Sequence, residues 1–339
     1  MLNRQVLLRS RPAGIPQAQD FEIVETPVAE PADGQVLVRN AYLSVEPAMR
    51  GWVSAVANYS APVPLGGVMR AFAVGVVERS RHPLYRAGDV VTGLFGWQEW
   101  AVLDEGAIAR RVPDNGLPVS TALGVLGLTG LTAYFGLLEV GEPRRGETVG
   151  VSTAAGSVGS AVGQIAKLHG CRTVGIAGGP AKVALCTREF GYDAAIDYRA
   201  PGWERALADA CAPGVDVYFD NTSGAVSDAV LPHLAVGARV VVCGTASVAS
   251  WDPWPAGPRV ERHLLVKRAR MQGVLATDHT ARYGEALARL EQWVRDGALK
   301  YREDILEGIA RAPDAIAGLY RGENLGKRLI RVGPEPRAR

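Results

Sequence analysis

One glycine-rich segment, residues 146–179, constrains the fold of this 339-residue chain more than any other. Residues 148–153 are a short apolar run that suits a buried strand, and residues 172–177 are a second such run. Between them, residues 160–169 place small and apolar side chains at helical spacing. The segment therefore predicts one continuous unit of strand, turn, helix and strand.

The turn inside this unit, residues 154–159, reads AAGSVG and matches the dinucleotide fingerprint G-x-G-x-x-G, with Ala154 in the first glycine position. Gly156 would let the backbone approach a pyrophosphate, and Gly159 would let the helix pack closely on the strand. The free N–H groups and the positive dipole end of the helix suit phosphate. The alternative is a tight turn that binds no ligand. The position of this motif between a strand and a helix favours nucleotide binding instead.

The end of the second strand indicates which dinucleotide is bound. An NAD site usually has Asp or Glu there to accept hydrogen bonds from the ribose hydroxyls. Here residues 176–179 read IAGG, with no carboxylate, and Lys182 follows, with Arg188 and Arg199 further on. A cation in place of a carboxylate suits a 2′-phosphate and favours NADP(H). The alternative is that Lys182 is an ordinary solvated residue at a helix start.

Composition excludes several other function classes. Hydrophobic residues make up 47% and charged residues 21% of the chain, and the formal net charge is +2. The chain has enough apolar residues to form a sizeable core. Its small net charge does not indicate binding to nucleic acid or to an anionic membrane. The N-terminus is too charged for a signal peptide, and no apolar run approaches the ~20 residues of a membrane span. We expect a cytoplasmic protein with a small-molecule substrate and no nucleic-acid or membrane partner.

The metal-ligating residue types are scattered. The four cysteines form no C-x-x-C pair, and the five histidines are not paired at helical spacing. Small buried thiols explain the cysteines better than disulfides do. No zinc or other metal site is therefore expected.

The pattern of apolar residues along the chain changes near residue 120. Before it, short apolar runs broken by glycine and proline suggest a small, partly closed β-barrel, with strands expected in residues 66–77 and 89–94. After it, a long apolar stretch at 121–138 predicts helices, and strands then alternate with helices. Further helices are expected at 182–190, 203–210, 225–234 and 281–296, and further strands at 194–198, 215–220, 238–243 and 267–276.

This alternation predicts an α/β fold with a doubly wound parallel sheet. Residues 322–332 read as a turn and a strand that rejoin the barrel. We expect one domain formed by residues 1–122 and 300–339, and a second formed by residues 123–299.

Ligands of doubly wound sheets lie beyond the carboxyl ends of the strands. Asn221, Thr222, Gly244 and Thr245 follow two such ends and should face the cofactor, unless they are only loop residues. The segment 251–259, WDPWPAGPR, is too rich in proline for a helix interior. It is interpreted as a mobile loop or lid, or as a partner-docking loop.

The order of barrel, doubly wound sheet and return to the barrel resembles the medium-chain dehydrogenase/reductase superfamily. The branch it resembles is that of the zinc-free alkenal and prostaglandin reductases, which includes bacterial curcumin reductase. The resemblance covers nearly the whole chain and implies a Rossmann domain and a GroES-like domain. It rests on the motifs at 43–47, 49–51, 66–69, 124–127, 154–159, 163–167, 193–198, 218–221, 243–244, 271–273 and 322–327.

By this resemblance the cofactor is NADP(H). Lys182 matches the lysine that grips the 2′-phosphate, Tyr198 the tyrosine beside it, and Asn324 an asparagine that reaches the cofactor from the returning segment. The family is often dimeric, so a homodimer is expected. The cofactor-binding residues implied are Ala155, Gly156, Ser157, Val158, Gly159, Gly179, Lys182, Tyr198, Asn221, Cys243, Thr245, Leu275 and Asn324.

The family reaction, carried over as an expectation, reduces a carbon–carbon double bond conjugated to a carbonyl. Hydride goes to the β-carbon, and charge collects on the carbonyl oxygen. The protein must orient the reacting carbons and supply hydrogen-bond donors at that oxygen. A ribose hydroxyl of the cofactor can be one donor, so no metal is needed.

The chain departs from the family pattern in its substrate pocket. The motif usually carries tyrosine before Met-Arg-Gly, where this chain has Ala48, and a second usual tyrosine is replaced by Ala249. These changes predict a wider pocket with fewer acidic hydroxyls. By the resemblance, Tyr59 matches a tyrosine in a loop that borders the pocket and is the candidate catalytic donor; the alternative is a surface aromatic in a mobile loop. The expected pocket residues are Ala48, Met49, Trp52, Tyr59, Ala249 and Trp251.

Three functions stay open at this point. The first is an NADPH-dependent reductase of enones, with a wide or unusual pocket. The second keeps hydride transfer but acts on quinones or on a larger biosynthetic scaffold. The third is an NADPH-binding protein without efficient catalysis.

Overall fold

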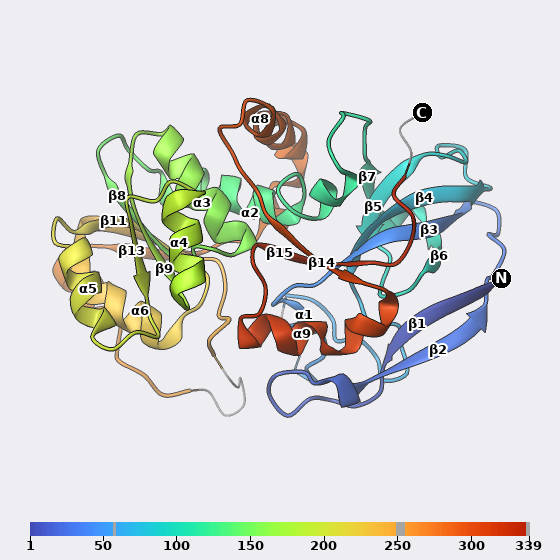
Figure 1. Cartoon of the computed structure of the whole chain (residues 1–339), viewed down its shortest axis with the longest axis horizontal. Helices are drawn as coiled ribbons and strands as arrows, with labels where there is room; N and C mark the ends of the chain where they lie inside the picture. Colours follow the sequence, from blue (N-terminus) through green and yellow to red (C-terminus); the bar gives the residue numbers. More distant parts are fainter. Residues whose placement is uncertain (57–58, 249–254, 337–339) are drawn as a thin grey trace. The chain divides into compact units, whose positions relative to one another are not determined.

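The computed structural model describes residues 1–56, 59–248 and 255–336 and divides the chain into two compact units (Figure 1). The first unit is Met1–Leu123 with Glu303–Arg339, and the second is Gly124–Arg302. The domain boundaries expected from the sequence differ from these by one residue at the first junction and by three at the second. Within the described residues, no helix is long and apolar enough to cross a membrane.

The second unit is built on a parallel sheet of six strands in the order β10-β9-β8-β11-β12-β13. In chain order this is 3-2-1-4-5-6, the arrangement of a doubly wound dinucleotide-binding sheet. The predicted α/β fold is confirmed. The strands are β8 Thr148–Ser152, β9 Arg172–Ala177, β10 Ala194–Asp197, β11 Val215–Asp220, β12 Leu234–Val242 and β13 Arg270–Gly273.

Helices cover both faces of this sheet. On one face, Val174 and Ile176 of β9 share a buried cluster with Leu207 of α5 and Val226 of α6. On the other face, Gly175 lies against Tyr192, and α3 packs on β8 and β9. Figure 1 shows α3 to α6 around the strands. The helices are α2 Leu128–Phe135, α3 Ser157–Leu168, α4 Pro180–Arg188, α5 Trp203–Ala210, α6 Gly224–Val230, α7 Glu261–Lys267 and α8 Tyr283–Arg295.

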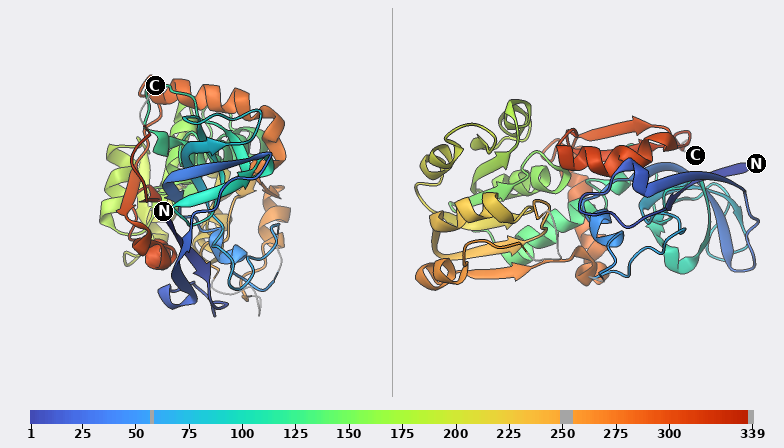
Figure 2. Two further views of the ribbon diagram at one scale, coloured as in Figure 1. Left: turned by 90° about the vertical axis from the view of Figure 1, so that its right-hand side faces the viewer. Right: turned by 90° about the horizontal axis from the view of Figure 1, so that it is seen from below.

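The first unit is organised around β3, Gln35–Ser44, which is buried along most of its length. One edge of β3 pairs with β4, and the other pairs with β6 and then with β15, Lys327–Arg331. The expected return of the C-terminal segment is confirmed, and Figure 2 shows this red segment beside the blue strands. The remaining elements are β1 Leu2–Leu8, β2 Phe21–Pro27, α1 Met49–Trp52, β4 Phe72–Ser80, β5 Val90–Leu94, β6 Trp100–Asp104, β7 Ile108–Arg111, β14 Glu303–Glu307 and α9 Ala312–Arg321.

A buried ionic cluster holds β15 to the end of β3. The Lys327 ammonium donates to the Ser44 hydroxyl at 2.6 Å and to the Val45 carbonyl at 3.1 Å, and pairs with Glu46 at 3.3 Å. Lys327 and Glu46 are both buried, and burial lowers the pKa of Lys327. Because removal of either partner would leave a buried charge alone, the cluster fixes the chain just before α1.

The helices expected at 121–138 are present: a 3₁₀ turn ends at Leu123, α2 begins at Leu128, and a π-helix follows at Gly136–Gly141. The structure corrects two other expected elements. Residues 267–276 contain a strand of only four residues, because α7 runs to Lys267 and Arg268 closes it in the left-handed conformation. The strand expected at 66–77 begins at residue 72, after a turn.

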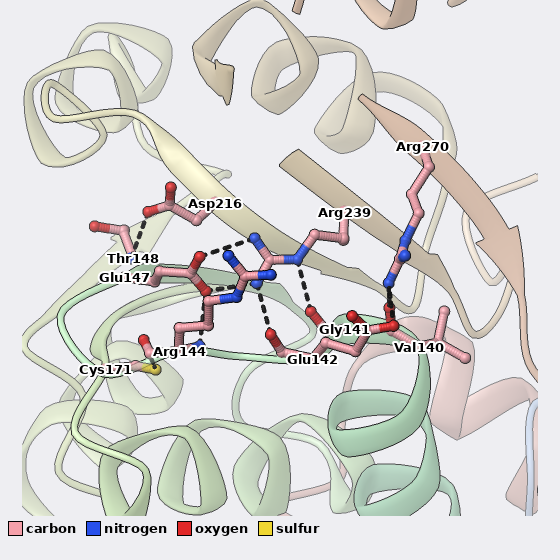
Figure 3. Close-up of polar contacts among 10 residues, drawn as sticks. All are labelled: Val140, Gly141, Glu142, Arg144, Glu147, Thr148, Cys171, Asp216, Arg239 and Arg270. Carbon is pink, nitrogen blue, oxygen red and sulfur yellow. Dashed lines mark hydrogen bonds and ion pairs between the residues drawn. The ribbon is translucent and has the colours of Figure 1, made fainter. Parts of the chain in front are cut away.

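Ion pairs stabilise the amino-terminal edge of the parallel sheet (Figure 3). Arg239 of β12 donates to the carbonyls of Gly141 and Glu142 at 2.9 and 2.8 Å and pairs with Glu147 at 2.9 Å. Arg270 of β13 donates to the Val140 carbonyl at 2.9 Å. Since these carbonyls end the π-helix, the arginines satisfy acceptors that the helix itself cannot.

The packing of α3 generates a stability prediction. A Cβ atom on Gly163 would lie 2.1 Å from the ring of the buried Tyr192, so Gly163→Ala should lower the free energy of unfolding by about 1–3 kcal/mol. Gly284→Ala in α8 is the control, because nothing lies within 4 Å of its Cβ position and alanine favours a helix by up to about 1 kcal/mol. Urea unfolding measures both, and equal effects would contradict the packing described.

Candidate functional site

The carboxyl-terminal edge of the parallel sheet gathers the residues expected to bind a cofactor. Since all six strands are parallel, the loops that follow them leave the sheet at one edge. The expected residues of the second unit occur in or next to these loops: Ala155 to Gly159 after β8, Gly179 and Lys182 after β9, Tyr198 after β10, Asn221 after β11, Cys243 and Thr245 after β12, and Leu275 after β13. Their contact with a cofactor stays a prediction.

The turn after β8 has the geometry of a phosphate-binding turn. Thr153 adopts a left-handed φ of 53°, and the Gly156 N–H donates to its carbonyl at 2.8 Å. A Cβ on Gly159 would lie 2.3 Å from the same carbonyl, so a side chain there would push α3 away from β8. Helix α3 starts at Ser157, and its first N–H groups lack acceptors within the helix. These features fit a pyrophosphate.

Ala154 replaces the first glycine of the fingerprint without disturbing the turn. It is fully buried, and its N–H donates to the Ile176 carbonyl at 3.0 Å. Its methyl group lies 2.8 Å from the position that a Cβ on Gly175 would take. The space for the alanine is therefore provided by the glycine on the neighbouring strand.

The ends of β9 and β10 present cations and a phenol. The Tyr198 hydroxyl and Arg199 Nε lie 2.9 and 3.0 Å from the Cβ position of Gly178, and the Arg199 guanidinium stands 5.7 Å from the Tyr198 ring. Lys182 is in the first turn of α4 and is partly exposed. Asp197 Oδ1 accepts the N–H groups of residues 179 and 199, at 2.8 and 3.0 Å. The Asp197 carboxylate thus accepts hydrogen bonds from the backbone. Lys182, Arg199 and the Tyr198 hydroxyl are groups of the kind that bind an anion.

The loops after β11 and β12 are tied to each other and to β8. The Asn221 side-chain amide donates to the Ser152 carbonyl at 2.7 Å, and the Ser152 hydroxyl accepts the Asn221 N–H at 2.8 Å. The Cys243 N–H donates to the Asp220 carbonyl at 2.8 Å. Burial, and then the charge of Asp220, raise the pKa of Cys243 to about 12. The Cys243 thiol therefore stays protonated near neutral pH and is a poor nucleophile.

The expected residues of the first unit differ in exposure. Ala48 stands immediately before α1, and Met49 in α1 is fully buried in the core of the unit. Trp52 is also buried, and its indole N–H has no hydrogen-bond partner within the described part of the chain. Tyr59 is 61% exposed. Ala249 and Trp251 lie outside the described residues.

Asn324 stands in the turn before β15, in the first unit. It is 9% exposed, and its side-chain amide donates to the Gly326 carbonyl at 2.8 Å. This bond fixes the side chain, and its expected contact with the cofactor stays a prediction.

Two polar residues of interest were missed by the sequence analysis. Tyr320 in α9 donates to the Pro47 carbonyl at 3.1 Å, beside Ala48, and the Arg50 guanidinium stands 5.6 Å from its ring. Burial raises the pKa of Tyr320, and Arg50 acts in the opposite direction. Asp220 is a buried carboxylate at the end of β11. Neither belongs to a local pattern, and only the fold brings Tyr320 next to residue 47.

Over residues 1–56, 59–248 and 255–336, no group of three or more His, Cys, Asp or Glu side chains is arranged to hold a metal ion.

Two family models match the chain. The model for the N-terminal domain of oxidoreductases matches residues 4–110, and the model for zinc-binding dehydrogenases matches residues 157–292. Together they match segments of both units.

Similar proteins match along nearly the whole chain. The NADPH-dependent curcumin reductase of Escherichia coli (strain K12) is 44% identical over 97% of this chain and 97% of its own. The NADP(+)-dependent 2-alkenal reductase of Nicotiana tabacum is 35% identical over 98% of each chain. The solved structure of CurA from Vibrio vulnificus in complex with NADPH superimposes with a TM-score of 0.91, at 40% identity, and covers 98% of this chain and 99% of that one.

The likeness extends over both units, so the expected combination of a Rossmann domain with a GroES-like domain is confirmed. The chain belongs to the zinc-independent medium-chain dehydrogenase/reductase family.

Proposed function

We propose that this chain is an NADPH-dependent reductase that reduces the carbon–carbon double bond of an α,β-unsaturated carbonyl compound. The proposal rests on the residues at the carboxyl-terminal edge of the parallel sheet. Neighbouring strands are followed there by the glycine turn, by Lys182, and by Tyr198 with Arg199. The names of the similar reductases support both the cofactor and the reaction.

The residues of the second unit fit the parts of NADP(H). The N–H groups at the start of α3 would hold the pyrophosphate, with Gly159 keeping the helix close to β8. Lys182, with Tyr198 and Arg199, would hold the 2′-phosphate. Asn221, fixed by Ser152, would position the nicotinamide side. When bound, the reduced cofactor supplies a hydride.

The chain itself must orient the substrate and stabilise charge at its carbonyl oxygen. We propose that the segment around α1 contacts the substrate, with Ala48 leaving room for a bulky molecule. Tyr59, with its exposed side chain, is the proposed hydrogen-bond donor to the carbonyl oxygen. The chain's own contribution then needs no metal ligand.

Ala48 also supports a second candidate function. A small residue at this position suits a quinone or a larger scaffold as hydride acceptor, and we keep this as the alternative. Binding of NADPH without efficient catalysis is the third possibility. Oxidation of NADPH in the presence of enones, quinones and saturated ketones separates the three functions, because only the first requires enones to be the preferred acceptors.

We also propose that the protein acts as a homodimer in the cytoplasm. The outer edge of β13 pairs with no strand among the described residues, and α7, which precedes β13 in the chain and packs on β12, exposes Leu265 and Val266. An open edge of this kind can pair with a second copy around a two-fold axis. The four free cysteines suit a reducing compartment. Light scattering would return the mass of two chains, and a monomer would overturn the dimer.

Lys182→Ala tests the cofactor preference. Loss of a charge-assisted contact with the 2′-phosphate should raise KM for NADPH by about 10–100-fold and leave KM for NADH nearly unchanged. Arg188→Ala is the matched control, because Arg188 ends the same helix. Steady-state kinetics with both cofactors measure the effect. Equal changes for NADPH and NADH would remove the phosphate role from Lys182.

Tyr59→Phe tests the proposed donor. It should lower kcat for an enone by about 10–1,000-fold, because a donor at the developing oxyanion is lost, while the Kd for NADPH stays constant. Tyr320→Phe is the comparison, because Tyr320 is a phenol that contacts the Pro47 carbonyl beside Ala48. Full activity in Tyr59→Phe with loss in Tyr320→Phe would transfer the role to Tyr320.

A further inference from the structure

Asp220 carries a buried carboxylate at a special position of the second unit. It is the last residue of β11 and is 4% exposed. β11 lies next to β8 in the sheet, at the point where the strand order reverses. Ligands of doubly wound sheets bind beyond the strand ends at this switch point. Asp220 is therefore a charged group directly beneath the expected binding edge.

Among the residues that the structure describes, the hydrogen-bond donors to Asp220 are neutral groups. Its Oδ2 atom accepts from the Ser227 hydroxyl at 2.6 Å. Its Oδ1 atom accepts from the backbone N–H groups of Thr222 and Ser223, both at 2.9 Å, and from the hydroxyls of Ser152 at 3.2 Å, Tyr218 at 3.3 Å and Thr222 at 3.4 Å.

No Lys, Arg or His side chain of residues 1–56, 59–248 and 255–336 pairs with this carboxylate. Five neutral residues solvate the charge without cancelling it. Buried carboxylates more commonly have a cationic partner, because desolvation of an unpaired charge is costly. The missing counter-charge therefore requires a functional or structural reason.

The charge of Asp220 acts on its surroundings. After burial, it is the next cause that raises the pKa of the Cys243 thiol and of the Tyr218 hydroxyl. It also raises the pKa of Asp228, again after burial, while His263 opposes this shift. The electrostatic field of Asp220 thus acts on Cys243, at the start of the loop after β12. The Cys243 N–H also donates a hydrogen bond to the backbone carbonyl of Asp220.

The nicotinamide half of the cofactor belongs to this part of the sheet. In a doubly wound sheet each half of three strands takes one mononucleotide, and the half that begins with the glycine turn takes the adenosine side. In this chain the glycine half is β8 to β10, so β11 to β13 would take the nicotinamide side. Asp220 begins the first loop of that half and stands next to Asn221.

We propose that the carboxylate of Asp220 makes this site favour the oxidised, positively charged nicotinamide over the reduced, neutral one. An unpaired negative charge stabilises the ring state that carries a positive charge and has little effect on the neutral state. Hydride donation converts the neutral state into the charged one, so the carboxylate would make bound NADPH a stronger reductant. This inference rests on the proposed function and assigns Asp220 as a positioning residue that acts through its charge.

A purely structural role for Asp220 makes a different prediction. The same hydrogen bonds hold the loop at residues 222 and 223 at the start of α6, in the manner of an Asx turn. Loss of that role alone would weaken oxidised and reduced cofactor alike. The ratio of the two dissociation constants therefore separates charge from loop structure.

The experiment measures the Kd of NADP⁺ and of NADPH by titration calorimetry, without turnover. In Asp220→Asn the ratio of the NADP⁺ Kd to the NADPH Kd should rise on the order of tenfold, mainly through weaker NADP⁺ binding, as expected for charges within about 10 Å at an effective dielectric constant of ~20. Asp216→Asn is the matched control, because Asp216 lies at the other end of the same strand and bonds the Thr148 N–H (Figure 3). It should leave the ratio unchanged.

Further variants keep the proposal testable. Ser227→Ala removes one hydrogen bond but keeps the charge, so the ratio should stay within about twofold of wild type. If Asp220→Asn does not fold, Asp220→Ser supplies a neutral group that can still accept the loop N–H bonds. An unchanged ratio in the folded neutral variant would overturn the charge role. Failure of the wild-type protein to bind either cofactor would instead refute the proposed function.

Discussion

The close approach of helix α3 to the end of strand β8 is the constraint on which the second unit depends. The carbonyl of Thr153 lies where a side chain on Gly159 would have to go, so only glycine allows the contact. Thr153 itself adopts a left-handed conformation, which a non-glycine residue takes at a cost in strain. This approach brings the first N–H groups of α3 to the sheet edge, and Tyr192 reinforces it by donating to the Gly159 carbonyl at 2.6 Å.

The two edges of the parallel sheet have different roles. At the amino-terminal edge, charged groups are paired with each other, as in the contacts of Arg239 with Glu147. At the carboxyl-terminal edge, the carboxylates bind backbone and hydroxyl groups instead: Asp197 holds the turns after β9 and β10, and Asp220 holds the loop after β11. Charge pairing therefore stabilises the amino-terminal edge, while backbone and hydroxyl donors hold the carboxylates of the carboxyl-terminal edge, where we propose that Lys182 and Arg199 contact an anionic ligand.

Much of this architecture could be predicted from the sequence, because local patterns determine it. The strands at residues 172–177 and 215–220 and the helix at 203–210 match their predicted bounds, since each is a clear apolar or amphipathic run between glycines and prolines. The helices expected at 121–138 are present, but their separate bounds could not be predicted, because the periodicity there is weak and Gly130 lets the preceding turn fold back onto α2, with the Val125 carbonyl 1.9 Å from its Cβ position.

The candidate site was predictable only where its residues follow strand ends. The glycine turn and Lys182 have a sequence pattern with a physical meaning, and their positions followed from it. Tyr320 could not be found in this way, because its contact with residue 47 is made by the return of the chain into the first unit. Asp220 reads as an ordinary strand end, and only the structure shows that no cation of the described residues pairs with it.

The most direct test of the account follows the hydride itself. The purified protein, treated with a chelator, is incubated with NADPH deuterated at C4 on the transferred side and an α,β-unsaturated ketone, and the product is analysed by mass spectrometry and NMR. We predict a saturated ketone with deuterium on the β-carbon. Deuterium on the carbonyl carbon of an allylic alcohol, or turnover that returns only when a metal is added, would contradict the central claim.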